Sequence, residues 1–142
     1  MMKVVMEWKD HMYFEGKGPS GHVVGVDAAE SVGGSNRAAR PMELLLNGLG
    51  GCTSIDILSI LNKMRLSPSS FHLEIDGERA EEHPKRFTKI HIHYFLEGEN
   101  LTEDKVRRAV QLSMEKYCSA AHSLNAEITA SFEINGVRYS MN

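Results

Sequence analysis

Cysteine is scarce in this sequence, which holds only Cys52 and Cys118, far apart along 142 residues. No CxxC pair is present, and this excludes a zinc knuckle and a thioredoxin-type redox motif. In a chain of this size outside an oxidising compartment, two such residues indicate free thiols or a redox pair. The sequence therefore does not describe a small domain held together by disulfides.

Basic tracts, phosphate-binding loops and a signal peptide are also missing. The net charge is −3 and the basic residues are scattered, which argues against a nucleic-acid or membrane-surface partner. The glycine-containing segments GGSNR and GKGPSG do not have the spacing of a phosphate loop, with its lysine directly after the last glycine. Polar residues interrupt the N-terminal MMKVVMEWKDHMYF, so it lacks the apolar core of a signal peptide. Asp56 and Lys63 interrupt the longest apolar run, so we expect no membrane-spanning segment. We expect a cytoplasmic protein.

The composition is that of an ordinary globular chain, with 42% hydrophobic and 25% charged residues, and it predicts a single domain over residues 1–142. Alternation of apolar and polar residues, together with turn signals, predicts the strands. Helix-start signals and helical periodicity predict the helices. The predicted strands cover residues 3–8, 11–15, 22–28, 71–80, 87–98 and the region 125–139, and the predicted helices cover 41–64 and 103–118. Helices covering antiparallel sheets make an α+β fold.

The first predicted helix, PMELLLNGLGGCTSIDILSIL, is apolar almost all the way round, yet it contains Cys52 and Asp56. At about 100° per residue these two side chains share one stripe of the helix. Its three central glycines, at positions 48, 50 and 51, weaken the helix, so we expect another helix or a ligand to approach closely there.

Each of these polar positions also has a purely structural interpretation. Cys52 can be a small core residue, as free cysteine often is. Asp56 needs a partner if it is buried, and Arg37 and Arg40 are the nearest cations in sequence. For Asp56 we expect a structural ion pair with one of these arginines.

Histidines offer a weaker signal for a metal site. Cys118 and His122 are one helical turn apart and could share a metal or activate a thiolate. His91 and His93 share one face of a predicted strand, but alternation with isoleucines is the commoner reason for that pattern. Because no further ligand set is visible in the sequence, we expect no metal.

Two segments, RPMELLLNGLGGCTSIDILSIL and MEKYCSAAHSL, resemble the two cysteine-bearing helices of the OsmC/Ohr family of osmotically induced and organic-hydroperoxide-resistance proteins. The resemblance implies antiparallel sheets packed around two long central helices in an intertwined homodimer. It also implies a peroxidase that acts on organic hydroperoxides without metal or organic cofactor. Cys52 would be the peroxidatic cysteine and Cys118 the resolving cysteine, and a lipoyl group or a protein dithiol would reduce their disulfide.

One departure from the family pattern concerns activation of the thiol. The resemblance implies an acid at the position of Met42, paired with an arginine from the N-terminal strands, yet residues 1–36 contain no arginine. Glu43 is next to that position, and Arg37 or Arg40, with Asp56, could take over the role. The alternative is an OsmC-fold protein without efficient peroxidase turnover, acting as a small-molecule binder or a thiol redox sensor at the dimer cleft. A third interpretation treats both cysteines as core residues.

Overall fold

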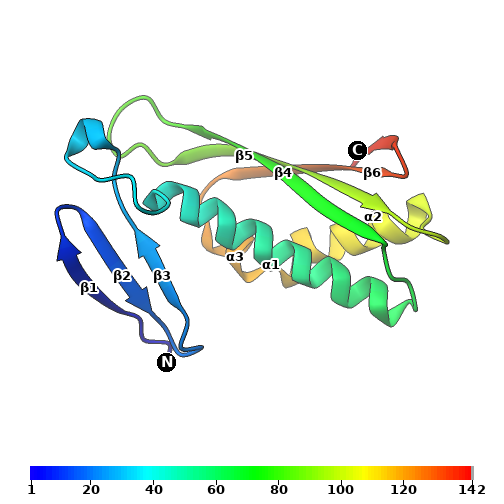
Figure 1. The fold of residues 1–142 in the computed structure, drawn as a ribbon. Coiled ribbons are helices and arrows are strands. Elements are labelled where there is room, and N and C mark those ends of the chain that lie inside the picture. The colour runs from blue at the N-terminus through cyan, green and yellow to red at the C-terminus, as the bar shows by residue number, and fades with distance from the viewer. Residues whose placement is uncertain (142) are drawn as a thin grey trace. The chain divides into compact units, whose positions relative to one another are not determined.

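The N-terminal part of the chain forms a small sheet of its own. A computed structural model describes residues 1–141, whose contacts separate into two compact units, Met1–Leu45 and the chain from Leu46 onward. The first unit contains an antiparallel sheet with the order β1 (Val5–Asp10), β2 (Tyr13–Lys17) and β3 (Val23–Val26) (Figure 1). This confirms the predicted meander. The single domain expected for the whole chain stays a prediction.

The second unit contains a four-stranded sheet in chain order. Its strands are β4 (Ser70–Arg79), β5 (Phe87–Glu97), β6 (Glu127–Ile134) and β7 (Val137–Ser140). A turn at Asn135 and Gly136 joins β6 to β7, and both residues have positive φ. β5 and β6 pair in parallel, so the expectation of purely antiparallel sheets is wrong at this pairing. The helical connection between these two strands makes a parallel pairing feasible.

The first helix has the predicted length and the second is shorter than predicted. α1 spans Pro41–Lys63, and α2 spans Glu103–Leu112 with Thr102 as its N-cap. Beyond α2 the chain forms a π-helical turn, Ser113–Tyr117, and then the short α3, Ser119–Ser123. The π turn ends the regular helical spacing. Tyr117, in the last position of this π turn, is 49% exposed.

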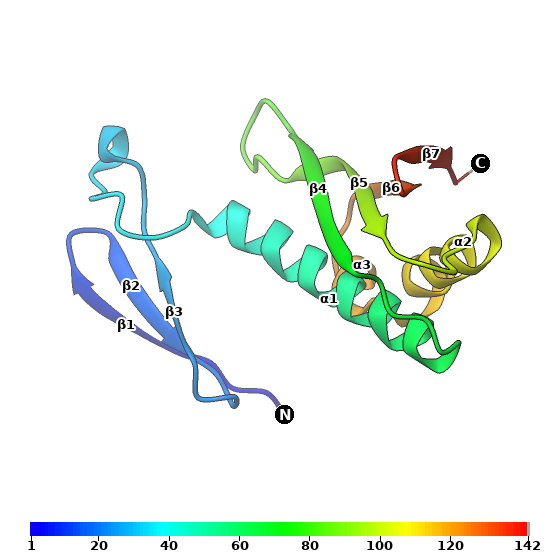
Figure 2. The ribbon, with the colours of Figure 1, turned by 45° about the vertical axis from the view of Figure 1, so that its right-hand side comes forward.

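All three helices lie on one face of the second sheet (Figures 1 and 2). Strand alternation buries Ile90, Ile92, Tyr94 and Leu96 of β5, as predicted. Gly50 lets α1 sit close to this sheet, because a Cβ at this position would be 2.6 Å from Cδ1 of Ile75. The element that comes close to this glycine is therefore the strand β4, whereas we expected another helix or a ligand.

The side of α1 away from the sheet is open and apolar. A Cβ added at Gly48 or Gly51 would meet nothing within 4 Å among the described residues. Ile55 is 69% exposed and Leu58 is 36% exposed. By length and composition alone α1 could also cross a membrane, since an 18-residue window of it has a mean hydropathy of 1.6, although we expected no such segment. The core helices of soluble proteins can have the same length and composition, so these two properties alone do not identify a membrane span.

Candidate functional site

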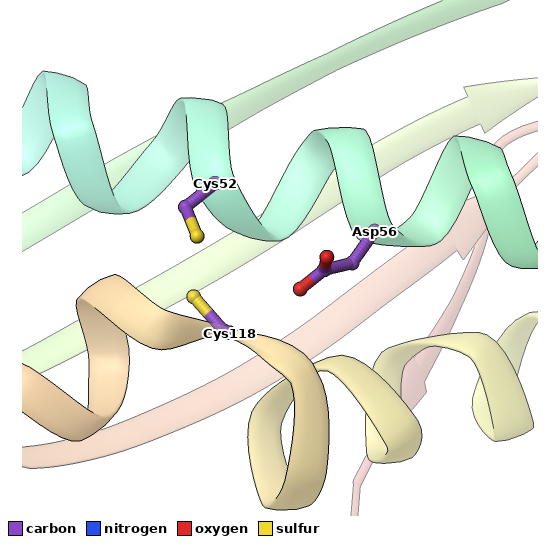
Figure 3. A group of neighbouring side chains, drawn as sticks. All are labelled: Cys52, Asp56 and Cys118. Atoms are coloured by element: carbon purple, nitrogen blue, oxygen red, sulfur yellow. The ribbon is translucent and has the colours of Figure 1, made fainter.

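Two thiols and one carboxylate meet between α1 and the segment that follows α2. Cys52 and Asp56 come from consecutive turns of α1, and Cys118 faces them from the opposite segment (Figure 3). The two sulfur atoms and a carboxylate oxygen of Asp56 all lie within 4.8 Å of one another. The tertiary structure thus brings together three residues that the sequence analysis selected separately.

The backbone around Cys118 explains why its side chain faces α1. Cys118 is not in the last turn of a regular helix, as we expected, but between the π turn and α3 with an extended backbone, φ −73° and ψ 97°. Its sulfur accepts a hydrogen bond from the N–H of Ala121 at 3.4 Å, so it caps the short helix. The π turn and the cap together orient the thiol. Single π turns of this kind often occur at functional sites.

The two thiols differ in their access to solvent. Cys118 is completely buried, whereas Cys52 is half-buried. Burial raises the pKa of the Cys118 thiol to about 11, partly offset by the hydrogen bond from Ala121, and the nearby Cys52 and Asp56 raise it further. Cys118 is therefore a protonated thiol at neutral pH. Cys52 is the more accessible of the two for a molecule arriving from solution.

A chain of buried hydroxyl groups ends on the Asp56 carboxylate. The Ser113 hydroxyl donates to Oδ2 of Asp56 at 3.0 Å. Oγ1 of Thr53 lies 2.8 Å from Oγ of Ser113 and 2.7 Å from the hydroxyl of Tyr94. Each hydroxyl has one proton, so with Ser113 donating to the carboxylate, Thr53 donates to Ser113 and Tyr94 donates to Thr53. Burial raises the pKa of Tyr94, which keeps this donor protonated.

This relay of hydroxyl groups was not predicted, because its residues come from distant elements of the chain. Thr53 and Ser113 are fully buried, and Tyr94 lies among the buried apolar residues of its strand face. A buried tyrosine normally finds a hydrogen-bond partner, so Tyr94 was the one residue in the sequence that could have indicated a buried polar contact here. The relay gives Asp56 a hydrogen-bond donor in Ser113, a partner that we did not anticipate.

The arginines proposed as partners of Asp56 belong to the first unit. There, Nη1 of Arg37 lies 2.6 Å from Oδ1 of Asp10, and its guanidinium lies 4.1 Å from the centre of the Tyr13 ring. The ion pair of Asp56 with Arg37 or Arg40 stays a prediction.

Arg40 and Glu43 lie at the start of α1, within the first unit. Arg40 donates from Nη2 to Oδ1 of Asn36 at 2.8 Å and from Nη1 to the carbonyl of Ala38 at 3.0 Å. Glu43 accepts the backbone N–H of Arg40 at 3.4 Å. Their predicted support for the thiol stays untested.

The histidines that we considered as metal ligands are exposed or form hydrogen bonds with protein side chains. His122 is exposed, and its backbone N–H donates to the carbonyl of Cys118 at 3.2 Å. On the other face of the sheet, His91 and His93 both hydrogen-bond the Ser131 hydroxyl. Nε2 of His93 also lies 2.6 Å from Oε2 of Glu133. The side-chain group best arranged to hold a metal, among the described residues, is Cys52, Asp56 and Cys118.

Known proteins resemble this chain over nearly its whole length. The family model of the OsmC-like protein matches residues 33–133. Protein YhfA of Escherichia coli K12 is 38% identical over 135 residues, which are 94% of this chain and 98% of YhfA. A crystal structure of an Aquifex aeolicus VF5 protein is 30% identical with a TM-score of 0.78, covering 95% of this chain and 98% of that one.

A more distant structure has the same fold. An organic hydroperoxide resistance protein from Elizabethkingia anophelis aligns with a TM-score of 0.67 over 95% of this chain and 96% of that one. Its sequence identity is 15%, so this likeness concerns the fold alone.

Proposed function

Because this chain belongs to the family of OsmC-like proteins, we propose that it is a thiol peroxidase that reduces organic hydroperoxides. The observation that carries the proposal is the meeting of Cys52 and Cys118 within 4.8 Å, with one thiol half-buried and the other fully buried. A peroxidatic cysteine must be reached by the peroxide, whereas a resolving cysteine need only reach its partner. The difference in burial supports a peroxidatic role for Cys52 and a resolving role for Cys118.

The reaction begins with the Cys52 thiolate. Its sulfur attacks the terminal oxygen of the hydroperoxide, the O–O bond breaks, and the departing alkoxide takes a proton to become an alcohol. Cys52 is left as a sulfenic acid. The Cys118 thiol then attacks the Cys52 sulfur, which forms the disulfide and releases water. Since a disulfide has an S–S distance of about 2.05 Å, the two side chains must move together in this step.

An external dithiol closes the cycle. It exchanges with the Cys52–Cys118 disulfide through a mixed disulfide, becomes a disulfide itself, and restores both thiols. A lipoyl group or a protein dithiol is the class of reductant that this step requires. The cycle uses no metal or organic cofactor.

We also propose that the protein is an intertwined homodimer with its two long helices at the centre. The support is the exposed apolar side of α1, where Ile55 and Leu58 face away from the sheet and where Gly48 and Gly51 leave open space. Exposed apolar surface of this kind is typical of an interface and supports the dimer proposal. A partner at this face would also enclose the open side of Cys52 and provide an apolar environment that suits an organic substrate.

Stopped-flow kinetics with cumene hydroperoxide and dihydrolipoamide test the peroxidase proposal. We expect Cys52→Ser to abolish peroxide consumption. Cys118→Ser should consume about one peroxide per chain in a first turnover and then recycle slowly, because the sulfenic acid has no internal thiol partner. His122→Ala changes an exposed residue near Cys118 and serves as the matched control with normal turnover. A Cys52→Ser variant as active as the wild type would contradict the proposal.

Met42 supports the alternative of a redox sensor or small-molecule binder, since the resemblance implies an acid at its position. A sensor would form the Cys52–Cys118 disulfide with about one peroxide per chain but would not turn over rapidly with a dithiol. The same experiment separates the two functions, because it measures the first turnover and the steady state independently.

A further inference from the structure

The donor atoms of Cys52, Asp56 and Cys118 form a three-ligand set for a metal ion. All three lie within 4.8 Å of one another, and two come from residues four apart on one face of α1 (Figure 3). Two ligands at this spacing on a helix can bind one ion, as in helical zinc motifs. We propose that the reduced protein binds one thiophilic divalent metal ion, zinc in particular, through the two thiolates and the carboxylate.

The distances are close to those that a tetrahedral ion requires. With Zn–S bonds of about 2.3 Å, two sulfur atoms on one tetrahedral zinc ion lie about 3.8 Å apart. The donor atoms here are at most 4.8 Å apart, so side-chain movements of about 1 Å would suffice. Three ligands leave the fourth position for water or another small ligand, which is the arrangement of reactive rather than structural zinc sites.

The identity of the donors selects the metal. Thiolate sulfur is a soft ligand that favours zinc and other thiophilic ions over magnesium or calcium. The three groups carry three negative charges when ionised, and a divalent cation offsets two of them. Cys52 and Asp56 are only half-buried, so an ion can reach the site from solution.

Neighbouring groups already orient the ligands. Ser113 donates to Oδ2 of Asp56 and leaves its other oxygen for a metal, and the N–H of Ala121 donates to the Cys118 sulfur. Outer hydrogen bonds of this type hold metal ligands in place and commonly contribute tenfold or more to affinity. The hydroxyl relay through Thr53 and Tyr94 extends this support into the core.

Metal binding and disulfide formation exclude each other at this site. Both use the same two sulfur atoms, so a bound ion would keep the thiols reduced but unavailable for attack on a peroxide. Conversely, oxidation to the disulfide would release the ion. The inference concerns the reduced protein alone and does not depend on the proposed peroxidase activity.

Cobalt(II) titration of the reduced, desalted protein under anaerobic conditions tests the site. Thiolate-bound cobalt gives a sulfur-to-metal charge-transfer band in the near ultraviolet, which a cobalt ion bound only by carboxylate or histidine does not give. We expect this band to saturate at one cobalt per chain. Excess zinc should displace the cobalt and remove the band.

Variants assign the ligands. Cys52→Ser and Cys118→Ser should each remove the one-equivalent band, and Asp56→Asn should weaken cobalt binding at least tenfold. His122→Ala is the matched control and should bind cobalt like the wild type, since His122 is the alternative partner of Cys118. Far-ultraviolet circular dichroism verifies that each variant is folded, and zinc should raise the Tm of the wild type in an independent measurement.

Four outcomes would contradict the proposed metal site. The first two are the absence of the charge-transfer band in the wild type and its persistence in either serine variant. The other two are an unchanged cobalt affinity in Asp56→Asn and the loss of the band in His122→Ala. Cobalt binding is measured without peroxide. A protein that binds cobalt yet consumes no hydroperoxide would therefore support the metal site and contradict the peroxidase. A protein that consumes hydroperoxide but does not bind cobalt would support the peroxidase and contradict the metal site.

Discussion

At the scale of single residues, Cys118 and Cys52 are chemically unequal although they lie side by side. The buried Cys118 has a pKa of about 11, so it enters any reaction as a thiol and must lose its proton during disulfide formation. The half-buried Cys52 is the thiol that a solute can reach. Accessibility, more than residue type, separates their proposed roles.

The pKa of Cys118 predicts how stability depends on pH. The unfolded thiol ionises near its ordinary pKa of 9, whereas the folded thiol keeps its proton until about pH 11. Between these values the unfolded state binds fewer protons, so the free energy of unfolding should fall as the pH rises. Urea unfolding of the reduced protein at several pH values measures this slope. Cys118→Ser should show a smaller decrease over this range, and equal slopes would contradict the prediction.

At the scale of secondary-structure elements, the glycines of α1 have different surroundings. Gly50 is buried against β4, where an added Cβ would be 2.6 Å from the Ile75 side chain. The neighbouring Gly51 faces open space, with nothing within 4 Å of an added Cβ among the described residues. Gly50 thus allows α1 to pack closely against the sheet, whereas Gly51 lies on the exposed side of the helix.

Two alanine substitutions in α1 should therefore differ in stability. Gly51→Ala should raise the free energy of unfolding by up to about 0.5–1 kcal/mol through helix propensity. Gly50→Ala gains the same propensity but must displace the Cδ1 end of the Ile75 side chain, so its free energy of unfolding should be lower than that of Gly51→Ala. Urea unfolding under conditions that keep the chain monomeric compares the two variants. Equal stability of both would show that α1 does not pack on the sheet as described.

Predictability also differs between elements. Strand alternation and the Thr102 cap were enough to place β4, β5 and the start of α2, because these signals are local. The π turn after Leu112 was not predicted, since the sequence there continues a helical pattern. The turn accompanies contacts that only the folded chain makes, including the hydrogen bond of Ser113 to Asp56.

At the scale of the whole molecule, the apolar side of α1 is the feature that most needs a partner. Ile55 is 69% exposed in the single chain, although it lies in a helix that is apolar almost all the way round. A homodimer that covers this side would remove that surface from water, with a gain of roughly 25 cal/mol per Å² buried.

A charge on this side should disrupt the dimer. Ile55→Lys places a cation at the centre of the exposed apolar side, where burial in an interface would be costly. We expect the wild type to be a dimer at micromolar concentration and Ile55→Lys to shift toward monomer, as measured by multi-angle light scattering. Val137→Lys, at an exposed valine of β7, is the matched control and should remain dimeric. A monomeric wild type, or a dimer unaffected by Ile55→Lys, would contradict this interface.

It was possible to predict from the sequence alone the α+β class, a long helix over residues 41–64, most strand positions and the importance of Cys52, Cys118 and Asp56. These depend on local periodicity, caps and motifs. Only the tertiary structure decided that the three side chains meet, that β5 and β6 run parallel, and that a relay from Tyr94 ends on Asp56. These features join residues that are distant in the chain, and contacts of this kind arise from packing, which no local pattern encodes.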